Sequence, residues 1–274
     1  MAITYYMLQI PPWVFFISIV AFGATVGILV TFLVPKYAKV KVLRAHNEVT
    51  GFLFLAIASF YSLLLSFIVL IVWNQFNDVR SNVSKEGSSA MGLYRDIKYY
   101  PDTLEGKQLM RVYLDFVFQV VDEEFPNMEH MKPSRKTPEA FSRVFFKMEH
   151  LNPKNSFNGQ LVAEMFNHLN ELDRYRGLRS TSIHAEIAPH LWLPILLGGL
   201  ITLICAAFLD LEHRPMHLLL NAMLGAFIGM FLFIIVSLDH PFSGEQGIKP
   251  NAYKEIFTLE QWAKEPVLDL TQSN

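Results

Sequence analysis

The sequence predicts an all-α integral membrane protein with four transmembrane helices in two pairs and a helical extramembrane domain between spans 2 and 3. Four stretches without Asp, Glu, Lys or Arg support this fold class, because each exceeds the roughly 20 residues that an α-helix needs to cross about 30 Å of hydrocarbon. These stretches are 12–34, 50–73, 187–209 and 218–238.

A long polar segment separates the second stretch from the third, and it carries most of the charge of a chain that is 52% hydrophobic and only 18% charged. We therefore predict a first helix pair at 12–73, an extramembrane domain at 74–186, a second pair at 187–238 and a C-terminal tail at 239–274.

Within the polar segment, amphipathic spacing predicts helices that are interrupted at Tyr100-Pro101, Phe125-Pro126 and Asn152-Pro153. We expect the second span to continue as a helix to residue 99, and a long helix to cover 156–186. Thr137 followed by Pro138 predicts an N-cap and a first helical residue. One face of a helix at 104–124 carries Leu109, Tyr113, Phe116 and Val120.

Several function classes lose support from the residues alone. A net charge of -2 gives no basis for nucleic acid binding, and Cys205 is the only cysteine, so an intrachain disulfide cannot form. The sequence has no phosphate loop, nucleophile elbow or His-Glu-x-x-His pattern, so we predict no enzyme activity and no cofactor. The cluster Asp210, Glu212, His213 and His217 fits no specific zinc spacing, so no metal is predicted.

Small residues recur at four-residue intervals on three of the spans and predict close helix packing. The neighbours are either helices of the same chain or helices of another subunit. The helix-packing candidates are Gly23 and Gly27 on the first span, Gly198 on the third, and Asn221, Gly225 and Gly229 on the fourth.

The second span carries a weakly polar stripe beside aromatic rings. Such a stripe can line a pore that gates by dewetting without a charged filter. Alternatively, the serine hydroxyls bond to carbonyls of the preceding helical turn. The pore-lining candidates are Phe52, Ala58, Ser59, Phe60, Tyr61, Ser62 and Ser66. Apart from His190, the spans hold no ionisable side chain, which disfavours proton relays and voltage sensors.

Basic residues lie near the membrane ends of the polar segment, where a basic vestibule would concentrate anions. Lipid headgroup contacts or ion pairs with carboxylates of the domain are the ordinary alternatives. The vestibule candidates are Arg80, Lys85, Arg174, Arg176 and Arg179. Lys36, Lys39, Lys41, Arg44 and Arg214 in the short connections weakly favour a large domain outside the cytoplasm.

Three passages resemble the bacterial bestrophin-like family, whose members are distant relatives of bestrophin anion channels. The passages are Trp73-Asn74-Gln75-Phe76 with Val83-Ser84-Lys85-Glu86-Gly87 and Leu93-Tyr94-Arg95, then Arg174-Tyr175-Arg176-Gly177-Leu178-Arg179 with Ala188-Pro189-His190-Leu191-Trp192, and finally Leu238-Asp239-His240-Pro241-Phe242-Ser243-Gly244. The resemblance implies a pentameric ring with the second spans around its axis, a bacterial inner membrane location, and a cytosolic domain, in conflict with the charge count.

Two functional hypotheses follow. The first is a homo-oligomeric channel that passively conducts anions such as chloride, or other small ions. The second is a structural or accessory membrane subunit without a transport role, which docks a heterologous partner through its helical domain.

Overall fold

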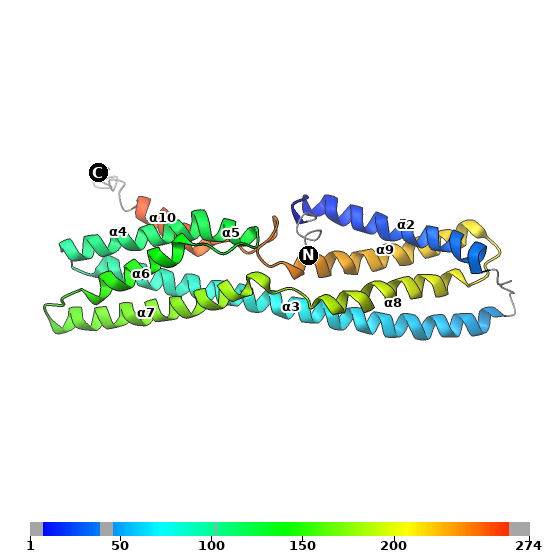
Figure 1. The fold of residues 1–274 in the computed structure, drawn as a ribbon, viewed down its shortest axis with the longest axis horizontal. Helices are drawn as coiled ribbons and strands as arrows, with labels where there is room; N and C mark the ends of the chain where they lie inside the picture. Colours follow the sequence, from blue (N-terminus) through cyan, green and yellow to red (C-terminus); the bar gives the residue numbers. More distant parts are fainter. Residues whose placement is uncertain (1–7, 39–45, 102, 263–274) are drawn as a thin grey trace, which may run out of the picture. The chain divides into compact units, whose positions relative to one another are not determined.

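The computed structural model describes residues 8–38, 46–101 and 103–262, and over these residues the chain forms helices joined by turns, with no strand. The predicted all-α fold class is therefore confirmed (Figure 1). The helices are α2 (Pro12–Ala38), α3 (Asn47–Tyr99), α4 (Leu104–Gln119), a π-helical turn (Val120–Glu124), α5 (Phe125–Glu129), α6 (Lys136–Glu149), α7 (Ser156–Thr181), a 3₁₀ turn (Ser182–His184), α8 (Pro189–Ala207), α9 (Arg214–Asp239) and α10 (Asn251–Trp262).

The chain divides into two compact units. The membrane unit comprises Met1–Asn77 and Ala185–Gln246, and the helical unit comprises Asp78–His184 with Gly247–Asn274, each within its described residues. Helix α3 contributes residues to both units. The region predicted as a separate C-terminal tail is likewise shared, because it changes units at residue 247.

Four of the described helices are long and apolar enough to cross a bilayer, as predicted. They are Pro12–Tyr37, Asn47–Tyr99, Pro189–Ala207 and Arg214–Asp239. Helix α3 runs unbroken for 53 residues, which agrees with the expected continuation of the second span.

The return path differs from the expected long helix at 156–186. Helix α7 ends at Thr181, and α8 begins only at Pro189. Proline disfavours a helical conformation in the preceding residue, and Ala188 is extended at φ -52° and ψ 126°. The third span therefore starts as a separate helix, with Pro189 in its first turn.

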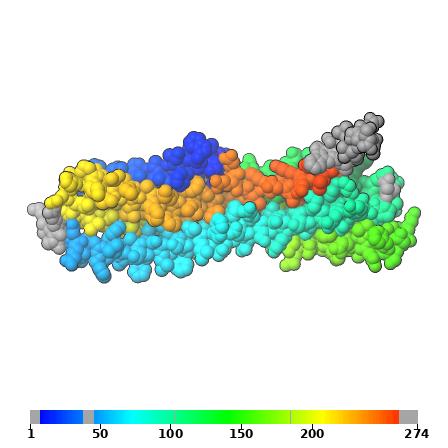
Figure 2. Space-filling model, turned by 180° about the vertical axis from the view of Figure 1, so that it is seen from behind, coloured from blue at the N-terminus to red at the C-terminus, as the bar shows by residue number. Residues whose placement is uncertain are grey.

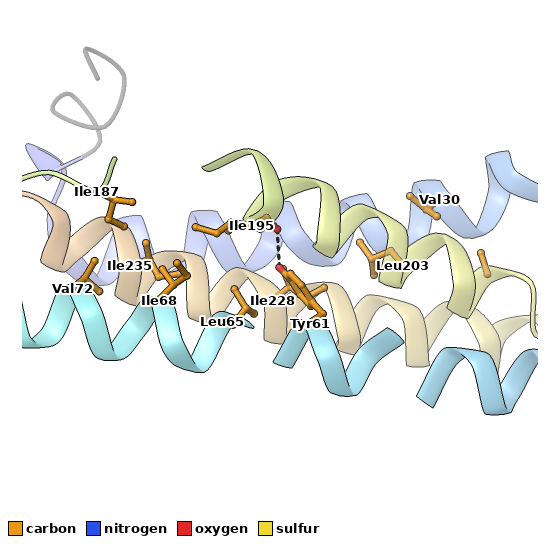
Figure 3. Close-up of a cluster of buried hydrophobic side chains, with 11 residues drawn as sticks. Val30, Tyr61, Leu65, Ile68, Val72, Ile187, Ile195, Leu203, Ile228 and Ile235 are labelled. Atoms are coloured by element: carbon orange, nitrogen blue, oxygen red, sulfur yellow. Dashed lines mark hydrogen bonds between the residues drawn. The ribbon is translucent and has the colours of Figure 1, made fainter. Parts of the chain in front are cut away.

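The core of the membrane unit forms where α3 meets α8 and α9. Tyr61, Leu65, Ile68 and Val72 lie three or four residues apart, so they share one face of α3. Figure 3 shows this face pointing toward buried residues of the neighbouring helices. Those neighbours are Ile195 and Leu203 of α8 with Ile228 and Ile235 of α9.

Helices α2 and α9 approach each other backbone to backbone, and Figure 2 shows the two in direct contact. A Cβ atom built on Gly23 would collide with the carbonyl oxygen of Gly225, and one on Gly27 would collide with that of Asn221. The side chain of Asn221 donates a hydrogen bond to Thr31 Oγ1 at 2.5 Å across the same interface. These small residues therefore pack helices of one chain.

In the helical unit, α4, α7 and α10 contact the C-terminal half of α3, and α6 packs against α4. The predicted face of α4 is confirmed, since Leu109, Tyr113, Phe116 and Val120 are fully buried. Local capping fixes two of the helix starts. Thr103 accepts a hydrogen bond from the amide of Gly106 at 3.1 Å, and Asn155 accepts one from Asn158 at 2.7 Å.

Two predicted details of this unit are wrong. Thr137 is not an N-cap but a fully buried residue inside α6. The backbone amide of Thr137 donates a hydrogen bond to the Ser134 hydroxyl at 3.3 Å. Phe125-Pro126 does not end the helix, because a π-helical turn carries the chain from α4 into α5 and leaves proline in the first turn of α5.

We expect Gly225→Ala to destabilise the protein by about 1–3 kcal/mol, because its new methyl group must displace the backbone of α2. Gly177→Ala is the control, since a Cβ there has no neighbour within 4 Å and alanine favours a helix by about 0.5–1 kcal/mol. Thermal melting in detergent compares the two variants. An unchanged Tm for Gly225→Ala would contradict the close α2–α9 contact.

Candidate functional site

One face of α3 is left uncovered by the rest of the membrane unit. Phe52 and Phe60 are each 74% exposed, and Ser59, Ser62 and Ser66 are also exposed. Seven residues make about two helical turns, so positions 52, 59 and 66 lie along one line. Opposite its buried face, α3 thus exposes rings and hydroxyl groups together with leucines such as Leu63 and Leu70.

The serine hydroxyls of this face differ in their hydrogen bonds. Ser59 donates to the carbonyl of Leu55 at 2.7 Å, and Ser66 donates to that of Ser62 at 2.8 Å. Ser59 and Ser66 therefore bond to carbonyls of the preceding helical turn, which is the alternative to pore lining given by the sequence. The Ser62 hydroxyl makes no hydrogen bond with the residues that the structure describes.

Tyr61 is separated from the other pore-lining candidates. It is 7% exposed, and its hydroxyl donates to the carbonyl of Ile195 at 3.1 Å (Figure 3). Its ring lies over Gly198, where a Cβ would come within 2.6 Å of Tyr61 Cδ2. Gly198 therefore makes room for Tyr61 within the same chain. Ala58 is half-buried between the two faces.

Three of the five predicted vestibule cations are exposed in the helical unit. Arg80, Lys85 and Arg174 face solvent on α3 and α7. Lys85 Nζ and the guanidinium of Arg174 each lie 5.6 Å from the centre of the Tyr175 ring, within the range of cation–π attraction. These cations can act on ions in the surrounding water.

The other two, Arg176 and Arg179, are buried in ion pairs. Arg179 Nε lies 2.6 Å from Glu86 Oε2, and its Nη2 lies 3.1 Å from Glu124 Oε2. Arg176 Nη2 lies 3.0 Å from Glu124 Oε1. The side chains of Glu86 and Arg179 are both fully buried. Arg176 and Arg179 thus form ion pairs with carboxylates of the helical unit, which was the alternative to a basic vestibule. These two arginines do not contribute to an exposed vestibule.

Glu124 reaches the buried ion pairs from the π-helical turn. We call the whole group the buried charge network, and its members are Glu86, Glu124, Arg176, Arg179 and Tyr253. A π-helical turn holds one more residue than a regular turn and re-aims the side chains that follow. Glu124 is its last residue and is 3% exposed. The turn thus places one carboxylate between two guanidinium groups.

Tyr253 of α10 completes the network. Its hydroxyl donates to Glu86 Oε1 at 2.6 Å, and burial together with the charge of Glu86 raises the pKa of Tyr253 well above its usual value. Burial opposes the charge of Arg179, but Glu86 and Glu124 outweigh it and raise the pKa of Arg179. Arg179 is therefore charged at every relevant pH.

Sequence reasoning missed Glu86, Glu124 and Tyr253 as partners. A signal was present, because Arg176 and Arg179 continue the 3.6-residue spacing of Leu169 and Leu172, which are fully buried. Arginines on the apolar stripe of an amphipathic helix need buried carboxylates.

A polar contact joins the end of α9 to the segment that precedes α8. The Asp239 carboxylate accepts a hydrogen bond from the Ile187 amide at 2.5 Å, and His240 Nδ1 lies 3.7 Å from Glu186 Oε1. No three His, Cys, Asp or Glu residues form a group able to hold a metal ion in the part of the chain described.

The fold and these sites define a multi-pass, all-α membrane protein with a helical unit inserted between its second and third spans. The Bestrophin-like domain family matches residues 19–253, and the chain belongs to this family. No curated protein matches the sequence.

Crystal structures of a bacterial bestrophin homolog from Klebsiella pneumoniae are similar in fold. One mutated form has a TM-score of 0.66 and 13% identity, covering 90% of this chain and 99% of that chain. A second mutated form has a TM-score of 0.63 and 14% identity, covering 88% of this chain and 96% of that chain. The structure phased by Zn-SAD has a TM-score of 0.65 and 13% identity, covering 89% of this chain and 99% of that chain.

We expect Arg179→Met to destabilise the protein by about 3–5 kcal/mol, because it leaves Glu86 charged and buried without its partner. Arg143→Met is the matched control, since the Arg143–Asp115 pair is solvent-exposed and such pairs contribute about 0–1 kcal/mol. Denaturant unfolding measures both variants. Equal losses would show that burial of the network contributes little.

From the raised pKa of Tyr253 we predict that the protein loses stability at alkaline pH. Its folded pKa is raised, so its contribution is complete below the ordinary tyrosine pKa near 10 and declines as pH rises toward the folded value. We expect Tyr253→Phe to lower Tm at neutral pH, because Glu86 loses a donor, but to flatten the fall in Tm as the pH rises above about 10. Parallel curves for the two proteins would contradict this assignment.

Proposed function

We propose that the chain is the subunit of a homo-oligomeric channel that passively conducts anions or small ions. The observation that carries the proposal is the uncovered face of α3, where phenylalanine rings and serine hydroxyl groups are exposed among aliphatic side chains such as Leu63 and Leu70. The hydroxyl of Ser62 is favourable beside water but costs free energy in hydrocarbon if it lacks a partner. Membership of the bestrophin-like family supports the same function.

The expected pore mechanism follows from the residues of this face. None of Phe52, Ser59, Phe60, Ser62 and Ser66 is charged, so an ion passing them loses hydration without gaining a counter-charge, and the barrier is mainly desolvation. The edge of an aromatic ring is electropositive, which favours anions over cations wherever phenylalanine edges face the pore. We therefore assign these five side chains to the pore lining.

The exposed cations supply a second contribution. Arg80, Lys85 and Arg174 would raise the local anion concentration outside the membrane, an effect that weakens as salt increases. The family resemblance favours a pentamer in the bacterial inner membrane with the helical unit in the cytosol. Our proposal adopts that arrangement over the weak positive-charge count, and it includes chloride among the ions carried.

The accessory-subunit function rests on a different observation. Large apolar side chains are exposed in the helical unit, namely Tyr99 at 75%, Leu104 at 73% and Phe157 at 70%. Exposed apolar groups of this size can bind a partner protein. A stoichiometric heterologous partner in native membranes, with no self-assembled ring, would favour this function over the channel.

Halide flux from liposomes tests the channel. We expect wild-type protein to release halide faster than empty vesicles, and Ser62→Trp to abolish that release because an indole fills the constriction. Ser18→Trp is the matched control, since Ser18 is an exposed serine on α2, bonded at 2.7 Å to its own helix, and lies outside the assigned lining.

Two outcomes would reject the channel. One is equal halide release from protein-containing and empty vesicles. The other is a wild-type particle that light scattering and imaging show to be a single subunit, because one copy has no axial opening. Equal block by Ser62→Trp and Ser18→Trp would reject the assigned lining alone.

A further inference from the structure

A cavity of about 310 Å³ opens where α8 joins α9 in the membrane unit. Its apolar wall includes Phe32 of α2 and Leu211 of the connection, and its polar wall includes Asp210, Arg214 and His217. Small-molecule sites in proteins occupy about 300–1,000 Å³, so this cavity is large enough for a lipid headgroup.

The polar wall is held in place by hydrogen bonds to neighbouring helices. The Asn47 side chain at the start of α3 donates to the Asp210 carbonyl at 2.7 Å and accepts from the Asp210 amide at 2.9 Å. His217 donates through Nε2 to the carbonyl of Ala206 at 3.1 Å. These hydrogen bonds fix the backbone of the connection against α3 and tie the first turn of α9 to the end of α8.

The two charged side chains of the cavity have no ion-pair partner within residues 8–38, 46–101 and 103–262. These side chains, Arg214 and Asp210, are exposed. In addition, His213 gives no side-chain hydrogen bond to the first turn of α9, so the backbone amide of Arg214, a residue of the cavity wall, has no capping side chain. A cation, an uncapped amide and a separate carboxylate thus lie beside an apolar wall.

We propose that this cavity binds the headgroup of a zwitterionic, amine-bearing phospholipid of the phosphatidylethanolamine class. The phosphate is placed at the guanidinium and backbone amide of Arg214, and the ammonium group at the Asp210 carboxylate. The acyl chains run along Phe32, which is 58% exposed, and Leu211.

Position and charge both favour this lipid over other ligands. The cavity lies at the ends of three apolar helices, where headgroups are found. A purely anionic lipid would meet Arg214 but would leave Asp210 without a partner and in repulsion. Free phosphate would satisfy Arg214 but would leave the apolar wall uncovered.

Lipid retention during purification tests the proposal. Protein in mild detergent is incubated with phosphatidylethanolamine, with phosphatidylglycerol or with inorganic phosphate, and bound lipid is measured by native mass spectrometry together with Tm. We expect only phosphatidylethanolamine to remain bound and to raise Tm. Arg214→Ala should reduce its retention by about tenfold, the effect of one charge-assisted contact.

Two further variants sharpen the result. Asp210→Asn should retain phosphatidylglycerol as well as phosphatidylethanolamine, because it removes the repulsion. Arg111→Ala, which removes an exposed arginine of α4, should leave retention unchanged. Since Arg214 and Asp210 are exposed, the lipid-free Tm of their variants should match wild type.

Three results would overturn the site. Equal retention of both lipids by wild-type protein would identify general lipid contact. An equal rise in Tm with inorganic phosphate would identify an anion site without a lipid role. Unchanged retention in Arg214→Ala would place the bound lipid elsewhere on the protein.

Discussion

The buried pairing of Arg179 with Glu86 and Glu124 is the interaction on which the helical unit depends. It joins α3, α7 and the π-helical turn, and Tyr253 brings α10 to the same point. Moving such charges out of water is costly, so the arrangement is stable only while every partner is present. The network thus fixes which helices pack together, because exchanging one of them would leave a charge unpaired.

The membrane unit is organised by a different constraint. Hydrocarbon offers helices no hydrophobic reason to associate, so close backbone packing must stabilise their contact. Gly23 and Gly225 give α2 and α9 that contact, while Tyr61 fits against Gly198 on α8. Because these small residues are used within one chain, they are not available to join subunits.

The sequence was sufficient to predict features that depend on composition and local spacing. The four spans, the unbroken α3 and the buried face of α4 follow from apolar periodicity over many residues. The partners of Arg176 and Arg179 could not be predicted, because Glu86 and Glu124 are far away in the chain and meet them only after folding. Tyr61 was grouped with Ser62 by adjacency, although neighbours on a helix point about 100° apart.

The distribution of charge decides how the proposed pore can discriminate between ions. Two of the five basic candidates are neutralised by buried carboxylates, which leaves Arg80, Lys85 and Arg174 to act on ions outside the membrane. The uncovered face of α3 holds no charge at all. In the proposed channel, attraction and discrimination are therefore assigned to different residues. The exposed cations would raise the local anion concentration, and the uncharged rings and hydroxyl groups would favour ions that dehydrate easily. Such a pore would rank anions by hydration energy, and it would keep that ranking when salt screens the cations.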